Sequence, residues 1–121
     1  MKIERFEDIE SWKEARILVR EVYRCLSVCN DFGFKDQMQR AAISVMSNIA
    51  EGFDRASNRE FIQFLVVARG SASEVKSQAY AALDIGYLDG DAFKAIIFRC
   101  TAITNLINGF IRFLKTSERK G

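Results

Sequence analysis

The sequence contains no proline and no histidine, and only 7 of its 121 residues are glycine. Proline interrupts helices and glycine weakens them, so their scarcity favours long helices over a turn-rich β fold. Without histidine, the chain lacks the usual base of nucleophilic catalysis and the Glu-x-x-His pairs of a di-metal carboxylate bundle. Neither a phosphate-binding loop nor a dinucleotide-binding glycine motif is present. We therefore expect a protein that is not an enzyme and that uses no cofactor.

Cysteine is scarce as well, and its three copies do not indicate disulfides or a metal site. The N-terminal residues lack the apolar run of an export signal, so we expect a cytoplasmic protein with reduced thiols. Cys25 and Cys29 would share one helix face, which permits metal ligation, but a closed zinc site needs four ligands. We favour packing of Cys25, Cys29 and Cys100 in the core and expect no metal. No apolar run is long enough for a membrane span, so we expect no membrane association.

Apolar residues recur at spacings of three and four residues in four segments, as in the buried stripes of amphipathic helices. This pattern predicts helices over residues 8–29, 36–54, 58–85 and 90–115. Long helices with short connections are typical of an antiparallel up-down-up-down bundle. We therefore predict an all-α four-helix bundle in which residues 1–121 form one domain.

Capping residues support several of these helix ends. Asp36 can cap the second helix, and Asp89 the fourth. Ser57 and Glu60 have the spacing of a capping box at the start of the third helix. Gly86 follows the last apolar position of that helix, so we expect it to end the helix in a left-handed conformation.

Residues 41–53 combine one apolar stripe with many small side chains, which would let a neighbouring helix come close. The small residues at 70–73 of the third helix are the expected partner, and Gly52 is typical of a helix end. A ridge of polar residues runs along the same segment. It is a ligand groove, a solvated surface or a structural network between helices. We favour the structural network, because buried polar groups must be paired. The ridge consists of Ser44, Asn48, Glu51 and Arg55.

The third and fourth helices carry more apolar residues than a small bundle can bury. The first half of the third helix is apolar almost all round. The fourth helix has a second apolar stripe beside its core stripe. This surplus predicts a homo-oligomer whose interface contains Ile62, Val66, Phe98, Ala102, Leu106 and Phe113.

The net charge of +2 is too small to indicate a nucleic-acid partner, but the basic residues are unevenly distributed. Residues 92–121 contain six basic residues and one acid. On the first helix, arginines four residues apart form a basic ridge. That ridge is either a solvated face or a phosphate-contacting surface. Glu21 lies nearby and would partly neutralise it, so the composition alone favours the solvated face. The candidate nucleic-acid contacts are Arg16, Arg20, Arg24, Arg112, Lys115, Arg119 and Lys120.

Two motifs identify a family that the chain resembles. Arg-Ala-Ala-x-Ser occupies residues 40–44, and Ser-Asn-Ile-Ala-Glu-Gly follows at residues 47–52. The similarity also includes residues 6–15, 60–65 and 68–71. These stretches closely resemble the bacterial four-helix-bundle family named after the 23S rRNA intervening-sequence protein.

The resemblance implies a cytoplasmic bundle that assembles as a ring-like homopentamer. A relative in this family, the accessory variability protein of diversity-generating retroelements, binds nucleic acid and a reverse transcriptase through a basic surface. The family often has proline where Met46 stands here, so we expect a straighter second helix. The resemblance supplies no catalytic residues. We thus expect a non-enzymatic homo-oligomer that binds RNA or DNA through arginine-rich faces. The alternative is a protein-interaction adaptor or scaffold without a nucleic-acid role.

Overall fold

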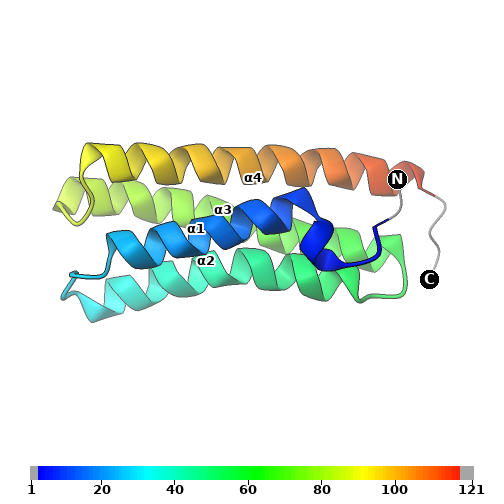
Figure 1. Ribbon diagram of the computed structural model, residues 1–121, viewed down its shortest axis with the longest axis horizontal. Helices are drawn as coiled ribbons and strands as arrows, with labels where there is room; N and C mark the ends of the chain where they lie inside the picture. The colour runs from blue at the N-terminus through cyan, green and yellow to red at the C-terminus, as the bar shows by residue number, and fades with distance from the viewer. Residues whose placement is uncertain (1–2, 118–121) are drawn as a thin grey trace.

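The structure, a computed structural model, describes residues 3–117. A short 3-10 helix, η1 (Phe6–Asp8), precedes the α-helices α1 (Glu10–Cys25), α2 (Phe32–Phe53), α3 (Asn58–Ile85) and α4 (Gly90–Thr116). The four α-helices lie side by side as a bundle (Figure 1). Helices α1 and α3 each pack against both α2 and α4. The predicted all-α, up-down-up-down four-helix bundle is confirmed.

A single stripe of each α-helix faces the common core. Leu18, Val45, Leu65, Ile96 and Ile103 are among the residues with no exposed surface. The buried residues recur at three- and four-residue spacing along each helix, so each helix buries one face. Within residues 3–117, no helix is both long and apolar enough to cross a membrane.

Helix α1 is shorter than the predicted segment at both ends. Its N-cap residue Ile9 has an extended backbone (φ −75°, ψ 124°), which separates α1 from η1. This step in the chain places the Ile9 side chain in the core. At the other end α1 stops at Cys25, so Cys29 lies beyond the helix. The expectation that the two cysteines share a helix face was therefore wrong; both thiols are free and pack in or against the core.

Helix α2 begins before the predicted cap. Asp31, rather than Asp36, is the N-cap residue, and its carboxylate accepts a hydrogen bond from the Phe34 backbone N–H at 3.2 Å. Asp36 instead accepts a hydrogen bond from Arg40 one turn later, at 2.8 Å. Tyr87 fixes the earlier start, because its hydroxyl donates to Asp31 at 2.7 Å. Helix α2 then continues without interruption past Met46.

The predicted caps of α3 and α4 are confirmed. The Ser57 hydroxyl accepts a hydrogen bond from the Glu60 backbone N–H at 3.2 Å. Gly86 ends α3 with φ 96°, in the left-handed region that only glycine enters without strain. Asp89 caps α4 by accepting a hydrogen bond from the Ala92 backbone N–H at 2.8 Å. These local signals place the start of α3 and the turn between α3 and α4.

Helices α2 and α3 approach closely at Gly52. A Cβ atom added there would lie 2.7 Å from the Cβ of Phe64 and 2.9 Å from Cδ1 of Phe61. Gly52 is buried inside α2, and the helix ends one residue later. Its role is therefore close packing, which corrects the interpretation of Gly52 as a stop signal. The expected contact between small residues is present as well, since the hydroxyls of Ser44 and Ser71 lie 2.9 Å apart.

Candidate nucleic-acid interface

The outer face of α1 carries the arginine ridge, which consists of Arg16, Arg20 and Arg24. All three side chains are exposed. The buried side of the helix carries Ala15 and Leu18. Residues four apart are separated by about 6 Å along a helix axis and by about 40° around it, so the three side chains leave neighbouring positions of one face. The ridge is thus a continuous strip of positive charge on one helix face.

Two acidic residues of α1, Glu14 and Glu21, are bound by α4. Arg99 of α4 donates hydrogen bonds to Glu14 Oε1 at 2.7 Å and to Glu21 Oε2 at 3.3 Å. The bonds to Glu21 and Glu14 raise the pKa of Arg99, which stays fully charged. These three side chains are largely buried between α1 and α4, with 18–26% of each exposed. The expectation that Glu21 neutralises the ridge was wrong, because its carboxylate is held by α4.

No ion pair to the ridge arginines occurs within residues 3–117. Each of them is also without a side-chain hydrogen bond to those residues. Arginine guanidinium groups bind phosphate through paired N–H donors when nothing else occupies them. The ridge therefore has unused capacity for anionic ligands.

A shallow groove of about 480 Å³ adjoins the N-terminal end of the ridge. Four basic residues and one acid line it, and the acid, Glu7, pairs with Arg5 at 2.8 Å, so the groove keeps a positive balance. The guanidinium of Arg16 lies 6.0 Å from the centre of the Trp12 ring. Sequence reasoning did not include Arg5 or Lys13 in this site. The groove is lined by Arg5, Glu7, Trp12, Lys13, Arg16, Ile17 and Arg20.

The basic residues of α4 lie on a different surface. Arg112 and Lys115 are exposed. Lys115 lines a groove between α3 and α4, together with Arg59 and Ile62 of α3. Arg119 and Lys120 fall outside the described residues. The structure therefore brings the three α1 arginines together in one ridge, and the described α4 cations stand apart from it.

The polar ridge of α2 is directed at α3. Asn48 donates to the Ser44 carbonyl at 2.8 Å and to its hydroxyl at 2.9 Å, and that hydroxyl contacts Ser71 of α3. One turn further on, Arg55 donates to Glu51 at 2.8 Å. Its guanidinium lies 4.6 Å from the centre of the Phe64 ring of α3. All four side chains thus take part in contacts within α2 or between α2 and α3.

A model of a known protein family matches most of the chain. Residues 7–109 match the model of the family described as 23S rRNA-intervening sequence protein. The chain belongs to the 23S rRNA-intervening sequence protein family. Comparison with curated proteins found no match.

A solved structure shares the bundle of this family member. It is the crystal structure of a protein with unknown function from Bacteroides thetaiotaomicron VPI-5482, described as belonging to the S23 ribosomal protein family. The two superpose with a TM-score of 0.78 at 21% sequence identity, over 84% of this chain and 98% of that chain. The likeness shows that the two proteins have the same fold.

The apolar residues predicted to form an oligomer interface lie on α3 and α4. Phe98 is 68% exposed and Phe113 is 45% exposed, although both are aromatic. Phe113 and Leu106 line a cavity between α1 and α4. Ile62 packs against the core and lines the groove between α3 and α4. Of the other two, Val66 is exposed and Ala102 half-buried.

Burial disfavours ionisation of two of the thiols of this family member. Burial raises the pKa of the Cys100 thiol to about 12. Burial also raises the pKa of Cys25. Among residues 3–117 there is no group of three or more His, Cys, Asp or Glu residues that could hold a metal ion. The arrangement suits binding through charge and apolar contact.

Proposed function

We propose that this protein is a non-enzymatic homo-oligomer that binds RNA or DNA through the arginine ridge of α1. The observation that carries the proposal is the pairing of Glu14 and Glu21 with Arg99. It removes the two nearest acids on α1 from the outer face. A face that was merely solvated would be expected to mix both signs of charge.

The ridge suits phosphate contacts that do not depend on base sequence. Its steps of about 6 Å are comparable to the distance between successive phosphates along one strand. It presents arginines without asparagine or glutamine, the side chains that read adenine edges. Phosphate contacts release counterions, so three of them give a logarithmic salt slope of about −2 to −3 per protomer.

The test measures affinity for a structured RNA and a duplex DNA at two salt concentrations. Between 50 and 200 mM salt, affinity should fall roughly 20- to 40-fold. The triple variant Arg16→Gln/Arg20→Gln/Arg24→Gln should bind more than tenfold more weakly at low salt, with a shallower salt slope. Binding that is absent, or indifferent to salt, would refute the proposal.

A control variant with the same loss of charge separates the ridge from net charge. Arg40, Arg59 and Lys94 are exposed cations on α2, α3 and α4. Replacing all three with glutamine should leave affinity within about threefold of the parent protein, because their charges lie far from the contacted phosphates. Equal losses in the two triple variants would show that only overall charge matters.

Exposed apolar residues on α4 support the homo-oligomeric part of the proposal. Phe98 is 68% exposed and its ring lies 5.8 Å from the guanidinium of Arg99, so most of this aromatic surface is left uncovered by residues 3–117. By its family resemblance, the proposed assembly is a pentamer. Light scattering at micromolar concentration should give a multiple of 13.8 kDa. Phe98→Asp should reduce that mass, whereas Val28→Asp, at an 87% exposed position, should not. A parent protein that is monomeric would refute this part.

The same apolar residues favour a second candidate function, a protein-interaction adaptor without a nucleic-acid role. In that case Phe98 and Phe113 would contact another polypeptide, and the arginines would only keep the protein soluble. A complex that survives nuclease treatment and is lost in Phe98→Asp would favour the adaptor. Loss of the complex on nuclease treatment would favour nucleic-acid binding.

A further inference from the structure

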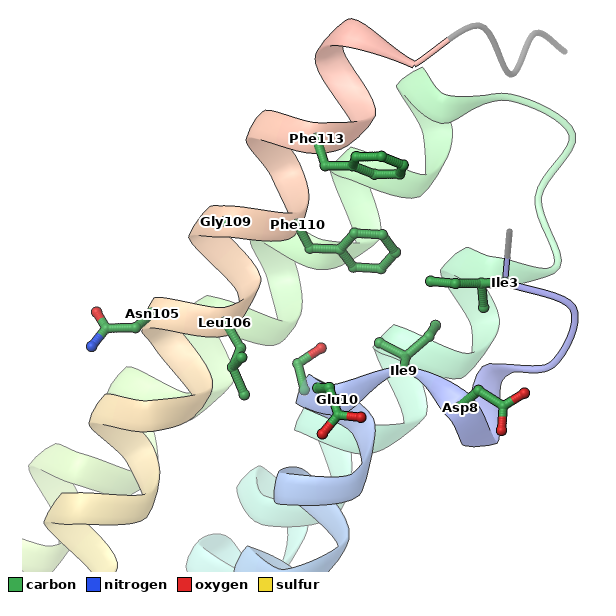
Figure 2. A pocket seen from close by; sticks show the side chains of 10 residues that line it. Ile3, Asp8, Ile9, Glu10, Asn105, Leu106, Gly109, Phe110 and Phe113 are labelled. Atoms are coloured by element: carbon green, nitrogen blue, oxygen red, sulfur yellow. The ribbon is translucent and has the colours of Figure 1, made fainter. Parts of the chain in front are cut away.

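A cavity of about 430 Å³ lies between the start of α1 and the C-terminal half of α4 (Figure 2). Phe110 and Phe113 reach from α4 toward Ile3 and Ile9 on the N-terminal segment. The lining is mostly apolar, and its volume falls in the range of sites for small molecules. The cavity is separate from the arginine ridge on the outer face of α1.

One polar group of the cavity wall lacks a partner. Ser11 lines the cavity and is only 2% exposed. Its hydroxyl has no hydrogen-bond partner among the described residues. An unpaired buried hydroxyl is costly, since the group has lost its hydrogen bonds to water. A ligand with a donor or acceptor would restore that hydrogen bond, which an apolar side chain from a second protomer would not.

The charges around the opening indicate the kind of ligand. Asp8 and Glu10 line the cavity with exposed carboxylates. No lysine or arginine of the described residues lines it. Arg112 is not a lining residue, although its Nη2 lies 3.7 Å from the position that a Cβ atom on Gly109 would take. A carboxylate ligand would thus meet two like charges, whereas a neutral or cationic group would not.

We propose that this cavity binds a hydrophobic small molecule with one neutral or cationic hydrogen-bonding group. The apolar body lies against the phenylalanine and isoleucine side chains. The polar group bonds to the Ser11 hydroxyl. This site is independent of the nucleic-acid proposal, because the cavity and the ridge share no residue.

Three probes with the same chain and different head groups test the ligand class: decan-1-ol, decylamine and decanoate, each below its micelle concentration. Binding is followed by NMR of protein with labelled isoleucine methyl groups. The alcohol and the amine should give saturable shifts of Ile3 and Ile9, at one molecule per protomer. The exposed Ile43 and Ile85 should not shift. Decanoate should bind at least tenfold more weakly; equal binding of all three, or shifts that do not saturate, would overturn the proposal.

Gly109 offers a way to fill the cavity without disturbing the core. It lines the cavity, and an added Cβ would meet only Arg112 Nη2, at an ordinary 3.7 Å. Gly109→Leu should abolish binding of decan-1-ol. Gly70→Leu is the matched control, since Gly70 also lies inside a helix and has open space around it. It should bind like the parent protein.

Ser11→Ala tests the hydrogen bond separately. It should weaken binding of decan-1-ol about tenfold, the ratio expected for one hydrogen bond. Unchanged affinity in Ser11→Ala or in Gly109→Leu would overturn the proposal. A changed subunit number of Gly109→Leu in light scattering would also overturn it, because the cavity would then hold a side chain of a second protomer.

Discussion

Replacing Gly52 with alanine should destabilise the bundle, although alanine is the better helix former. Inside a helix, alanine is favoured over glycine by about 1 kcal/mol. At Gly52, however, the new methyl group would lie 2.7 Å from the Cβ of Phe64. That atom is attached directly to the α3 backbone, so no side-chain rotation can remove the overlap.

The size of the effect follows from how far the helices must separate. Carbon atoms in good contact are about 3.5–4.0 Å apart, so α2 and α3 would have to move by roughly 1 Å at this point. Overpacking that forces backbone shifts costs about 1–3 kcal/mol, and we take the upper part of that range. After the gain in helix propensity, about 2 kcal/mol of destabilisation remains. For a chain of this length the melting temperature should fall by about 8 °C.

The assay is chemical and thermal unfolding at one fixed protein concentration, because association would shift apparent stability. Gly70→Ala is the control. Gly70 lies inside α3 with nothing within 4 Å of an added Cβ, so this variant should gain about 1 kcal/mol. The same chemical change should therefore act with opposite sign at the two positions. A Gly52→Ala variant as stable as the parent protein would refute the close-packing argument.

Two further predictions concern contacts between distant segments. Arg99→Met should lower the free energy of unfolding by about 1–3 kcal/mol, because Glu14 and Glu21 keep their partly buried charges without a partner. Adding Glu14→Gln and Glu21→Gln to this variant should recover part of the lost stability. No recovery would contradict the account. Hydrogen bonding lowers the pKa of Asp31 and raises that of Tyr87. The loss of stability caused by Tyr87→Phe should thus be constant between about pH 5 and 9. It should become smaller as pH falls through the lowered pKa of Asp31, and also as pH rises through the raised pKa of Tyr87. A loss that does not change with pH would exclude this bond as its source.

Local chemistry explains which helix ends could be predicted from the sequence. The caps at Ser57, Gly86 and Asp89 act within a few residues, and each was predicted. The start of α2 was misplaced because Asp31 and Asp36 are both competent caps. The hydroxyl of Tyr87 decides between them, and it lies 56 residues away in the sequence. Propensity and spacing contain no information about such a partner.

The candidate sites likewise combine features set by nearby residues, which the sequence predicts, with features set by distant residues, which it does not. The four-residue spacing of the ridge arginines indicated one helix face, as the structure shows. The partner of Glu21 could not be foreseen, since Arg99 is 78 residues away and was counted only as part of a basic segment. The cavity at Ser11 was missed for a related reason. It depends on η1 and Ile9, which bring Ile3 opposite α4.

Directional bonds occur at three of the four contacts between neighbouring helices. Arg99 joins α4 to α1, Ser44 and Ser71 join α2 to α3, and Arg69 of α3 donates to Asn108 of α4 at 2.7 Å. Sliding one helix by a turn, about 5.4 Å, would break any of these bonds, whereas aliphatic contacts are readily exchanged for similar ones. Within residues 3–117, the α1–α2 contact has no such bond. Because α1 is joined to α4, α4 to α3 and α3 to α2, these bonds together also fix the axial position of α1 relative to α2, although no polar bond joins those two helices directly.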